Sequence, residues 1–260
     1  MADVSLQSLC ELGQAQLVET QYLTSIATFV QAERIAWESG DLETLSRLYF
    51  PLQEARRQAR QRCGEGIVKL DLIASGPNDA SIDADRIVGQ CPHGQLLVAG
   101  WGSIRPAMDV RNLAMARGLY LETFLGAVYP ITGGGRAVAI VPLDDAKLPE
   151  PTERSIDALL PLLPPHSMVL PASQLPAGER RGTTQTFAET MAMWEQLHAP
   201  FLAAADASVD LLQRMQGYRK TLRVDGGCEL AHQRLAITAR ELDRTRRSQQ
   251  ASRHVPFDAD

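Results

Sequence analysis

The chain has 260 residues, of which 45% are hydrophobic, with 19 glycines and 15 prolines. This composition allows a sizeable core and excludes a disordered or fibrous protein. With 26 basic and 31 acidic side chains the formal net charge is -5, so no overall field would hold nucleic acid or an anionic membrane.

The beginning of the chain lacks the basic patch and apolar core of a signal peptide. No stretch approaches the roughly 20 apolar residues that span a bilayer, so we expect a cytoplasmic protein with no membrane partner. The four cysteines, Cys10, Cys63, Cys91 and Cys228, stand singly, without the close pairs of a zinc site. We therefore expect no metal site and no disulfide framework. No cofactor is predicted from the sequence.

Two helices with an apolar stripe are predicted before residue 67. Apolar side chains recur at helical spacing from about residue 14 to residue 38, and Gly40 ends this helix. Asp41 can cap a second helix that carries Pro51, so a kink is expected near residues 47 to 51. The segment 1–66 is therefore expected to form an antiparallel helical hairpin.

Residues 67 to about 176 alternate short apolar runs of strand length with helical patterns. Strands are expected over 67–72, 96–99, 137–141 and 168–170, and helices over about 80–90, 105–118 and 153–163. The stretch 120–129 fits a strand at its beginning, although its length also permits a helix. Such alternation is typical of an α/β protein with a mostly parallel sheet.

Helical periodicity returns after a polar connector at 171–178. Phe187 begins the stripe of one helix, Pro200 can open a second near 201–223, and a third is expected from about Glu229. The last dozen residues are expected to fray. The whole pattern predicts an α/β fold with three regions. A three-layer core with a mostly parallel sheet at 67–178 is flanked by the hairpin of 1–66 and by a three-helix segment at 179–260.

The segment from Tyr218 to Ala236 resembles the junction between two tetratricopeptide repeats. The family's order of an aromatic, a leucine, a turn aspartate and an Ala-x-x-x-Leu-Gly/Ala opening is matched by Tyr218, Leu222, Asp225, Ala231, Leu235 and Ala236. Gly40-Asp41-Leu42, with Leu45 and Tyr49, resembles the same family's internal turn. Gly226 replaces the family's proline, and a solenoid needs about three stacked repeats. The resemblance implies helices that bind another protein, whereas any antiparallel helix pair with a short turn offers the same pattern.

Polar side chains follow the predicted strands. In a parallel sheet, ligands bind outside the carboxyl ends of the strands. That edge is expected to gather the loop from Gly100 to Arg105 with Ser75, Asn78, Asp144, Asp145 and Ser173. Gly133-Gly134-Gly135 leads into a strand, so we expect this triple glycine at the opposite edge, as a flexible connector.

The loop Gly100-Trp101-Gly102-Ser103, with Arg105, is the leading candidate site. Backbone N–H groups, the Ser103 hydroxyl and the Arg105 guanidinium suit a phosphate or carboxylate, and Trp101 supplies a flat apolar wall. The loop lacks the glycine fingerprint for NAD and the Gly-Lys-Ser/Thr of an ATP site. It is similar to the phosphosugar-binding loops of sugar isomerase domains. The alternative is that Ser103 caps a helix opened by Pro106, with the glycines needed for packing.

Other chemistry-bearing residues have a structural explanation. Asp144 and Asp145 fit a solvated turn better than a metal site, because no second cluster completes one. Cys91-Pro92-His93-Gly94 places a thiol near an imidazole, but at the edge opposite the favoured site. The C-terminal arginines suggest an acidic partner or nucleic acid, yet interrupting Glu241 and Asp243 favour a solvated helix face. These arginines are Arg234, Arg240, Arg244, Arg246 and Arg247.

Two functions are compatible with these observations. The first is a soluble interaction or adaptor protein whose repeat-like helices, around an α/β core, bind another protein. The second is a protein that binds a small anionic ligand, or an enzyme acting on a phosphorylated sugar, through the loop 100–105. No nucleic-acid partner is expected, and no catalytic residue is identified.

Overall fold

The computed structural model describes residues 5–253, and side chains for residues 5–250. The chain divides into two compact units. One, called the helical unit, joins Met1–Arg57 to Phe201–Asp260; the other, the sheet unit, comprises Gln58–Pro200. The sequence predicts boundaries at 66/67 and 178/179 and leaves the packing of the two helical ends open. In the structure, the first and the last described helices belong to the same unit.

The helical unit contains more N-terminal helices than predicted. The stripe expected from about 14 to 38 is divided between α1 (Leu6–Val18) and α2 (Tyr22–Ser39), separated by Thr20 in the left-handed region with φ 61°. Gly40 ends α2 at φ 69°, and α3 (Leu42–Gly64) continues through Pro51. The predicted hairpin is therefore wrong in its number of helices, because a helix-compatible apolar spacing does not reveal one left-handed residue.

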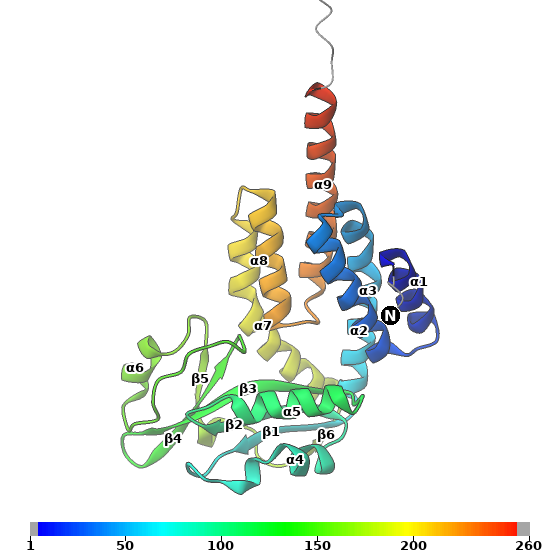
Figure 1. The fold of residues 1–260 in the computed structure, drawn as a ribbon. Helices are drawn as coiled ribbons and strands as arrows, with labels where there is room; N and C mark the ends of the chain where they lie inside the picture. The colour runs from blue at the N-terminus through cyan, green and yellow to red at the C-terminus, as the bar shows by residue number, and fades with distance from the viewer. Residues whose placement is uncertain (1–4, 254–260) are drawn as a thin grey trace, which may run out of the picture. The chain divides into compact units, whose positions relative to one another are not determined.

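Three helices follow the sheet in the described chain, as predicted. They are α7 (Thr184–Asp206), α8 (Leu211–Val224) and α9 (Glu229–Arg253), labelled in Figure 1. Pro200 lies inside α7, so it does not open the second helix as predicted. That helix, α8, is capped instead by Asp210, whose carboxylate accepts a hydrogen bond from the Gln213 amide. The predicted fraying of the last dozen residues lies partly outside the described residues.

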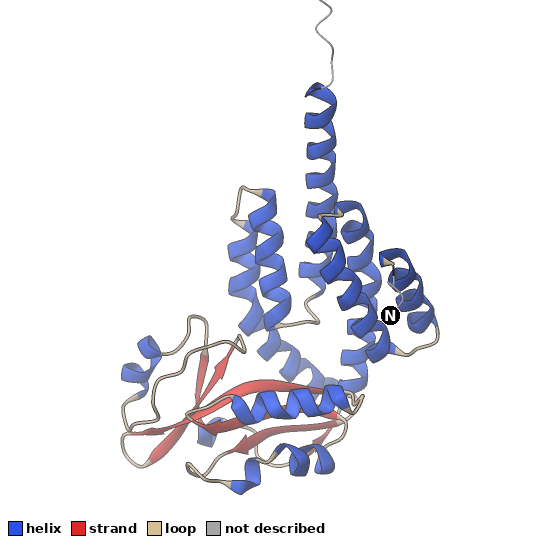
Figure 2. Cartoon of the chain, viewed as in Figure 1, coloured by secondary structure: helices blue, strands red, loops and turns tan. Residues whose placement is uncertain are grey.

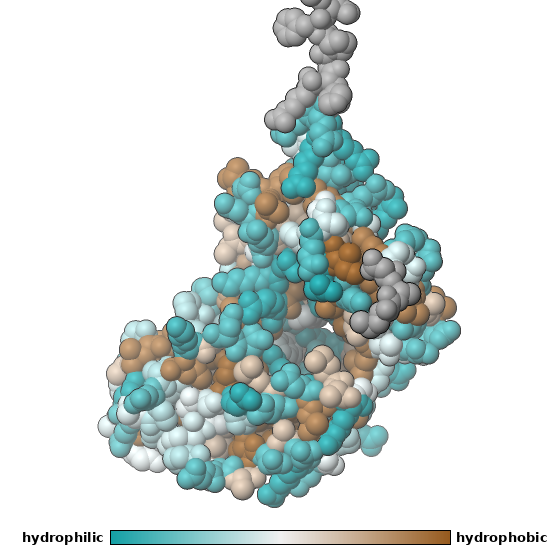
Figure 3. Space-filling model, in the orientation of Figure 1, coloured by the Kyte–Doolittle hydropathy of each residue, from teal (hydrophilic) through white to brown (hydrophobic). Residues whose placement is uncertain are grey.

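The core of the helical unit joins the two ends of the chain. Phe29 and Tyr49 from the N-terminal helices are buried with Tyr218 and Leu235 from the C-terminal helices. Burial of such large side chains stabilises the unit by roughly 1.5–3 kcal/mol for each of them. Beyond this core, residues 244–250 of α9 are exposed, and Figure 3 shows hydrophilic side chains there.

The sheet unit contains a six-stranded mixed sheet, shown as red arrows in Figure 2. Its strands are β1 (Ile67–Ile73), β2 (Gly94–Trp101), β3 (Leu121–Ile131), β4 (Gly135–Val141), β5 (Met168–Pro171) and β6 (Arg180–Arg181). Their spatial order is β5-β4-β3-β2-β1-β6. The pairs β1·β2 and β2·β3 are parallel, whereas β3·β4, β4·β5 and β1·β6 are antiparallel. The α/β class is therefore confirmed, but the expectation of a mostly parallel sheet is wrong.

The cause of the mixed sheet is a tight hairpin. The ambiguous stretch 120–129 forms most of β3, which ends beside β4 with Ile131 paired to Gly135. Thr132, Gly133 and Gly134 form a three-residue turn, in which both glycines are left-handed, with φ values of 92° and 81° that glycine adopts without a steric penalty. The triple glycine therefore reverses the chain directly, and no crossover helix is needed.

Helices cover the central strands of the sheet unit. The α5 helix (Arg105–Ala116) packs on β2 and β3 through buried Ala107, Val110 and Ala114, and α4 (Ala84–Gln90) packs beside α5 (Figure 1). The short elements are η1 (Ala80–Ile82), α6 (Ile156–Leu159), η2 (Leu160–Leu162) and η3 (Ala172–Gln174). Nearly every residue of β2 is buried, which requires cover on both faces because neighbouring side chains alternate.

The parallel strands give the sheet two distinct edges. The carboxyl edge is where β1, β2 and β3 end, and the amino edge is where they begin.

Among the described helices, none combines the length and the apolar character needed to cross a membrane.

Candidate functional site

The loop predicted to bind an anion lies at the carboxyl edge, where β2 leads into α5. Its backbone donors already have partners inside the protein. The Gly102 amide donates to the Val128 carbonyl (2.9 Å), and the Ser103 amide donates to the Gly100 carbonyl (3.4 Å). The Arg105 amide donates to the Ser103 hydroxyl (3.1 Å). The hydrogen bonds therefore fit the packing-and-capping alternative, and the anion site here stays a prediction.

Packing inside the protein also accounts for the residue types of this loop. Arg105 is exposed and pairs with Asp109 one turn along α5, with Nε 3.0 Å from Oδ1. A Cβ at Gly100 would lie 2.7 Å from the Pro106 ring, and one at Gly102 would lie 2.7 Å from the Pro151 ring. Trp101 is half-buried at the end of β2. Close packing thus explains both glycines without a ligand.

The other residues predicted for the carboxyl edge divide between the two edges. Ser75 and Asn78 follow β1, and Ser173 follows β5, which runs parallel to β3, so these three lie at the carboxyl edge. Asp144 and Asp145 follow β4, whose end Val141 pairs with Leu125 near the start of β3. The antiparallel hairpin therefore places both aspartates at the amino edge, and the triple glycine at the carboxyl edge, contrary to the prediction.

Cys91 and His93 lie at the amino edge, as predicted. Burial chiefly raises the pKa of the Cys91 thiol, and the nearby Glu179 carboxylate raises it further. Burial also raises the pKa of Cys63 well above its ordinary value. Both thiols are thus held in the protonated form, which is a poor nucleophile.

Glycines bring three chain segments into close contact at the amino edge. A Cβ at Gly66 would lie 2.3 Å from the His93 carbonyl oxygen, and one at Gly94 would lie 2.0 Å from the Ile67 carbonyl oxygen. A Cβ at Gly182 would lie 2.0 Å from the Gly64 carbonyl oxygen. These neighbours are backbone atoms, which cannot rotate away, so this corner accepts only glycine without rearrangement.

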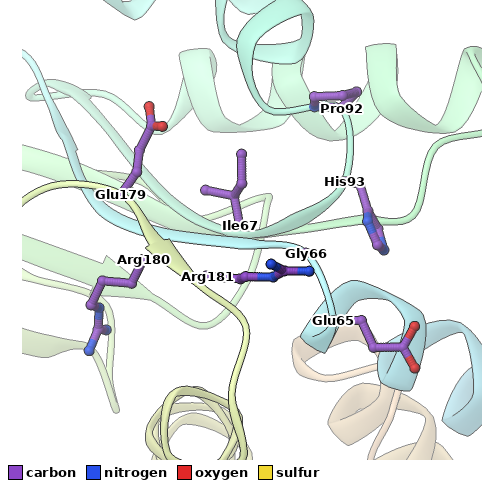
Figure 4. Close-up of a pocket in the computed structure, with 8 residues that line it drawn as sticks. All are labelled: Glu65, Gly66, Ile67, Pro92, His93, Glu179, Arg180 and Arg181. Carbon is purple, nitrogen blue, oxygen red and sulfur yellow. The ribbon is translucent and has the colours of Figure 1, made fainter.

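A cavity of about 440 Å³ opens at this corner, and we call it the corner cavity (Figure 4). Its lining comes from the start of β1, the turn before β2, and β6. The lining residues are Glu65, Gly66, Ile67, Pro92, His93, Glu179, Arg180 and Arg181. Figure 4 shows the Arg181 side chain extending from β6 toward Gly66, with His93 and Glu65 beyond.

The charged groups of the corner cavity differ in how far they are already paired. Glu179 accepts from Lys69 Nζ at 2.7 Å, and Arg180 pairs with Glu189 at 2.8 Å. Glu65 lies 3.6 Å from Arg62 in an exposed ion pair. Within the described residues, the exposed Arg181 guanidinium forms no hydrogen bond or ion pair. Arg180 Nη2 has no hydrogen-bond partner either, but it is buried, so Arg181 is the exposed cation of this cavity that is open to a ligand.

A second cavity, of about 470 Å³, lies in the helical unit, and we call it the basic groove. It is formed by side chains from α2, α3 and α8. The lining residues are Val30, Glu33, Arg56, Gln216, Arg219, Lys220, Leu222 and Arg223. Four of them are basic and one is acidic, in a chain whose net charge is negative.

Arg219 is oriented in the basic groove by an aromatic ring and a hydrogen-bonded chain. Its guanidinium carbon lies 4.4 Å from the centroid of Trp37, and its Nε lies 3.3 Å from the Glu33 carboxylate. Tyr49 donates to the same carboxylate at 2.9 Å and accepts from the Trp37 indole at 2.8 Å. Stacking and pairing fix the plane of the guanidinium, which lowers the entropy cost of binding an anion.

Arg56 is oriented from the other side of the basic groove. Its Nη1 lies 3.2 Å from both the Gly226 carbonyl oxygen and Nε2 of buried His232. The other ring nitrogen of His232, Nδ1, lies 2.9 Å from the Cys228 carbonyl. Nδ1 therefore carries the proton, and Nε2 accepts from Arg56. Two helices thus present oriented guanidinium groups to one groove.

The sequence contains a partial signal for each cavity. Arg219, Lys220 and Arg223 lie within the segment that resembles a repeat junction, but their convergence with Arg56 needs the fold of the helical unit. In the sequence, His93 stands out only as a partner of Cys91, and Arg181 belongs to a polar stretch after the predicted strands. A strand of two residues, β6, is too short to produce a readable alternation.

Comparisons with known proteins give no indication of function, so a functional proposal rests on the fold and the two cavities. Neither a family model, a curated protein nor a solved structure matched this chain. In the part of the chain that the structure describes, no group of three His, Cys, Asp or Glu side chains is placed to hold a metal ion.

Proposed function

We propose that the protein is an interaction protein whose helical unit binds an acidic segment of a partner protein in the basic groove. The observation that carries this proposal is the convergence of four basic side chains on one cavity with a single carboxylate. That carboxylate, Glu33, is itself bound by Arg219 and Tyr49. A segment with several carboxylates would complement the charge of the groove.

Apolar surface in the groove favours a peptide over a simple ion. Val30 is 40% exposed and Leu222 is half-buried, so both offer apolar contacts between the basic groups. Interfaces draw most of their affinity from such desolvated contacts, while charges provide orientation and rate. We therefore infer a segment that mixes acidic and apolar side chains.

The repeat-like junction supports the same proposal. Tyr218, Asp225, Ala231, Leu235 and Ala236 are buried, and their helices α8 and α9 pack together. With the apolar positions of α8 turned toward this core, the polar residues between them are left to line the groove. We propose that this unit uses a helix pair as tetratricopeptide-like modules do, to present a binding surface.

The test is fluorescence anisotropy with two labelled peptides of equal length, one alternating glutamate with leucine and one alternating lysine with leucine. The acidic peptide is expected to bind, and added salt is expected to weaken it by screening. Replacing both Lys220 and Arg223 by alanine is expected to lower the affinity about tenfold.

Arg240→Ala is the matched control, because Arg240 is exposed on α9 and does not line the groove. It removes a positive charge from the same unit and is expected to leave the affinity unchanged. Equal binding of the acidic and basic peptides, or equal loss in the control and the double variant, would refute the proposal.

A further inference from the structure

We propose that the corner cavity binds a free apolar α-amino acid, with the ligand's carboxylate on Arg181 and its ammonium group beside Glu65 and His93. This site lies wholly in the sheet unit and is independent of the basic groove. Its support comes from the arrangement of three groups of different character around Gly66 (Figure 4).

The first group is the cation. Arg181 is exposed at the cavity wall, and its guanidinium has no partner within the described residues, whereas Arg180 beside it is paired with Glu189. A guanidinium offers parallel N–H donors that match the two oxygens of a carboxylate. Arg181 can therefore hold a ligand carboxylate without breaking an existing ion pair.

The second group accepts hydrogen bonds. His93 Nε2 is bonded to the Arg62 carbonyl oxygen, so this nitrogen carries a proton. In the neutral ring, Nδ1 then keeps a lone pair that can accept from an ammonium group. The Glu65 carboxylate, exposed and only loosely associated with Arg62 at 3.6 Å, adds a negative charge to the same wall. An inorganic anion would be repelled by this carboxylate, whereas a zwitterion satisfies both signs.

The third group is apolar. Ile67 and Pro92 line the cavity together with the charged side chains. A volume of about 440 Å³ falls within the range of small-molecule sites and accommodates an amino acid with a modest side chain. These walls favour an aliphatic side chain over a charged one.

The glycine contacts keep these groups in place. Gly66, Gly94 and Gly182 allow the α3–β1 junction, the turn before β2 and the end of β6 to meet at backbone distance. The Gly182 amide donates to the Gly66 carbonyl at 2.7 Å, and the Ile67 amide donates to the His93 carbonyl at 3.0 Å. The segments that carry Arg181, Glu65 and His93 are thus hydrogen-bonded to one another, which favours a preorganised site.

The proposal is tested by isothermal titration calorimetry of the full chain with alanine, valine and leucine. At least one of them is expected to bind with a Kd below about 1 mM. N-acetyl-leucine, which lacks the ammonium group, and leucinamide, which lacks the carboxylate, are each expected to bind at least about tenfold more weakly than leucine. Inorganic phosphate is expected not to compete.

Arg181→Gln is expected to weaken binding of the amino acid at least about tenfold, while its circular dichroism and melting temperature stay those of the parent. Arg86→Gln removes an exposed arginine from α4 and serves as the matched control, with unchanged binding expected. No heat of binding from any of the three amino acids at about 10 mM overturns the proposal, as does equal binding of the blocked analogues or an unaffected Arg181→Gln.

Discussion

The two edges of the sheet use similar residues for different purposes. At the carboxyl edge, glycines and serines form turns whose hydrogen bonds are made within the protein. The amides of Gly102, Ser103 and Arg105 all have partners there. At the amino edge, glycines bring separate segments together, and charged side chains line a cavity. A glycine-rich strand-to-helix turn is therefore not enough to indicate a ligand site. A candidate site is distinguished by polar groups that can still form hydrogen bonds or ion pairs with another molecule.

The amino edge also contains a buried polar cluster. Arg60 is 5% exposed, and its Nε lies 2.9 Å from the Glu122 carboxylate, which also accepts from Gln95 at 3.0 Å. The Arg60 guanidinium lies 5.3 Å from the centroid of Trp194, and that ring stacks on Phe124 at 4.1 Å. The cluster thus joins α3, β2, β3 and α7 at this edge.

The largest effect is expected from breaking this cluster. Arg60→Ala leaves the Glu122 carboxylate without its buried cation, and we expect the free energy of unfolding to fall by about 3–5 kcal/mol. Urea denaturation followed by circular dichroism measures the loss. Arg57→Ala, one turn earlier on α3, removes an exposed ion pair with Glu54 and is expected to cost less than about 1 kcal/mol. Similar losses in the two variants would show that the cluster does not stabilise the amino edge.

The glycines of the two edges provide the next test. In Gly94→Ala the new Cβ would meet the Ile67 carbonyl oxygen at 2.0 Å, so the strands must separate, and we expect a loss of about 3 kcal/mol. In Gly102→Ala the strain comes from φ 59° and from the Pro151 ring, which lies on a loop and can move. We expect about 1–2 kcal/mol there. Thermal and urea unfolding of both variants give the comparison.

Gly89→Ala is the control for these two substitutions. Gly89 lies in α4, and no atom lies within 4 Å of the position of its added Cβ. Alanine at such a helical position is expected to stabilise the protein by about 0.5–1 kcal/mol. If Gly102→Ala costs as much as Gly94→Ala, the carboxyl edge is as tightly constrained as the amino edge.

Much of the fold can be read from the sequence, because most of its elements have strong local signals. The strands β1, β2, β4 and β5 follow from apolar runs, and α5 follows from its amphipathic spacing after Pro106. The predicted direction of β4 is wrong, although Gly133-Gly134 is itself the signal for a tight hairpin between two apolar runs. That single error moves Asp144 and Asp145 to the wrong edge.

The candidate sites can be predicted less well than the fold, because each depends on residues far apart in the chain. Arg56 and Arg219 line one groove although more than 160 positions separate them. Arg181 reaches Gly66 because β6 pairs antiparallel with the start of β1. No local pattern encodes such pairings, so the sequence points to the one glycine turn that looks like a site on its own.

The smallest effect is expected at the carboxyl edge, in the turn that follows β1. Asp79 accepts from the Ser75 amide and hydroxyl, both at 2.7 Å, and from the Ser81 amide at 2.8 Å. Hydrogen bonds from the residues Ser81 and Ser75 to the ionised carboxylate hold the pKa of Asp79 well below its usual value. The folded state therefore binds this proton less tightly than the unfolded state does. The stabilisation is present above the ordinary carboxyl pKa of about 3.9, and it is lost as the pH falls through the lowered value.

Asp79→Asn is expected to remove this part of the acid dependence, because an amide does not titrate. The urea midpoint of the variant should lie slightly below that of the parent at neutral pH, and the difference should shrink as the pH falls below about 3. Asp157→Asn, an exposed aspartate in the first turn of α6, serves as the control for losing one carboxylate. If the difference in urea midpoint between Asp79→Asn and the parent stays constant with pH, the ionised carboxylate does not contribute to the stability of the turn. The hydrogen bonds to the Asp79 carboxylate would then not be what stabilises this turn of the carboxyl edge.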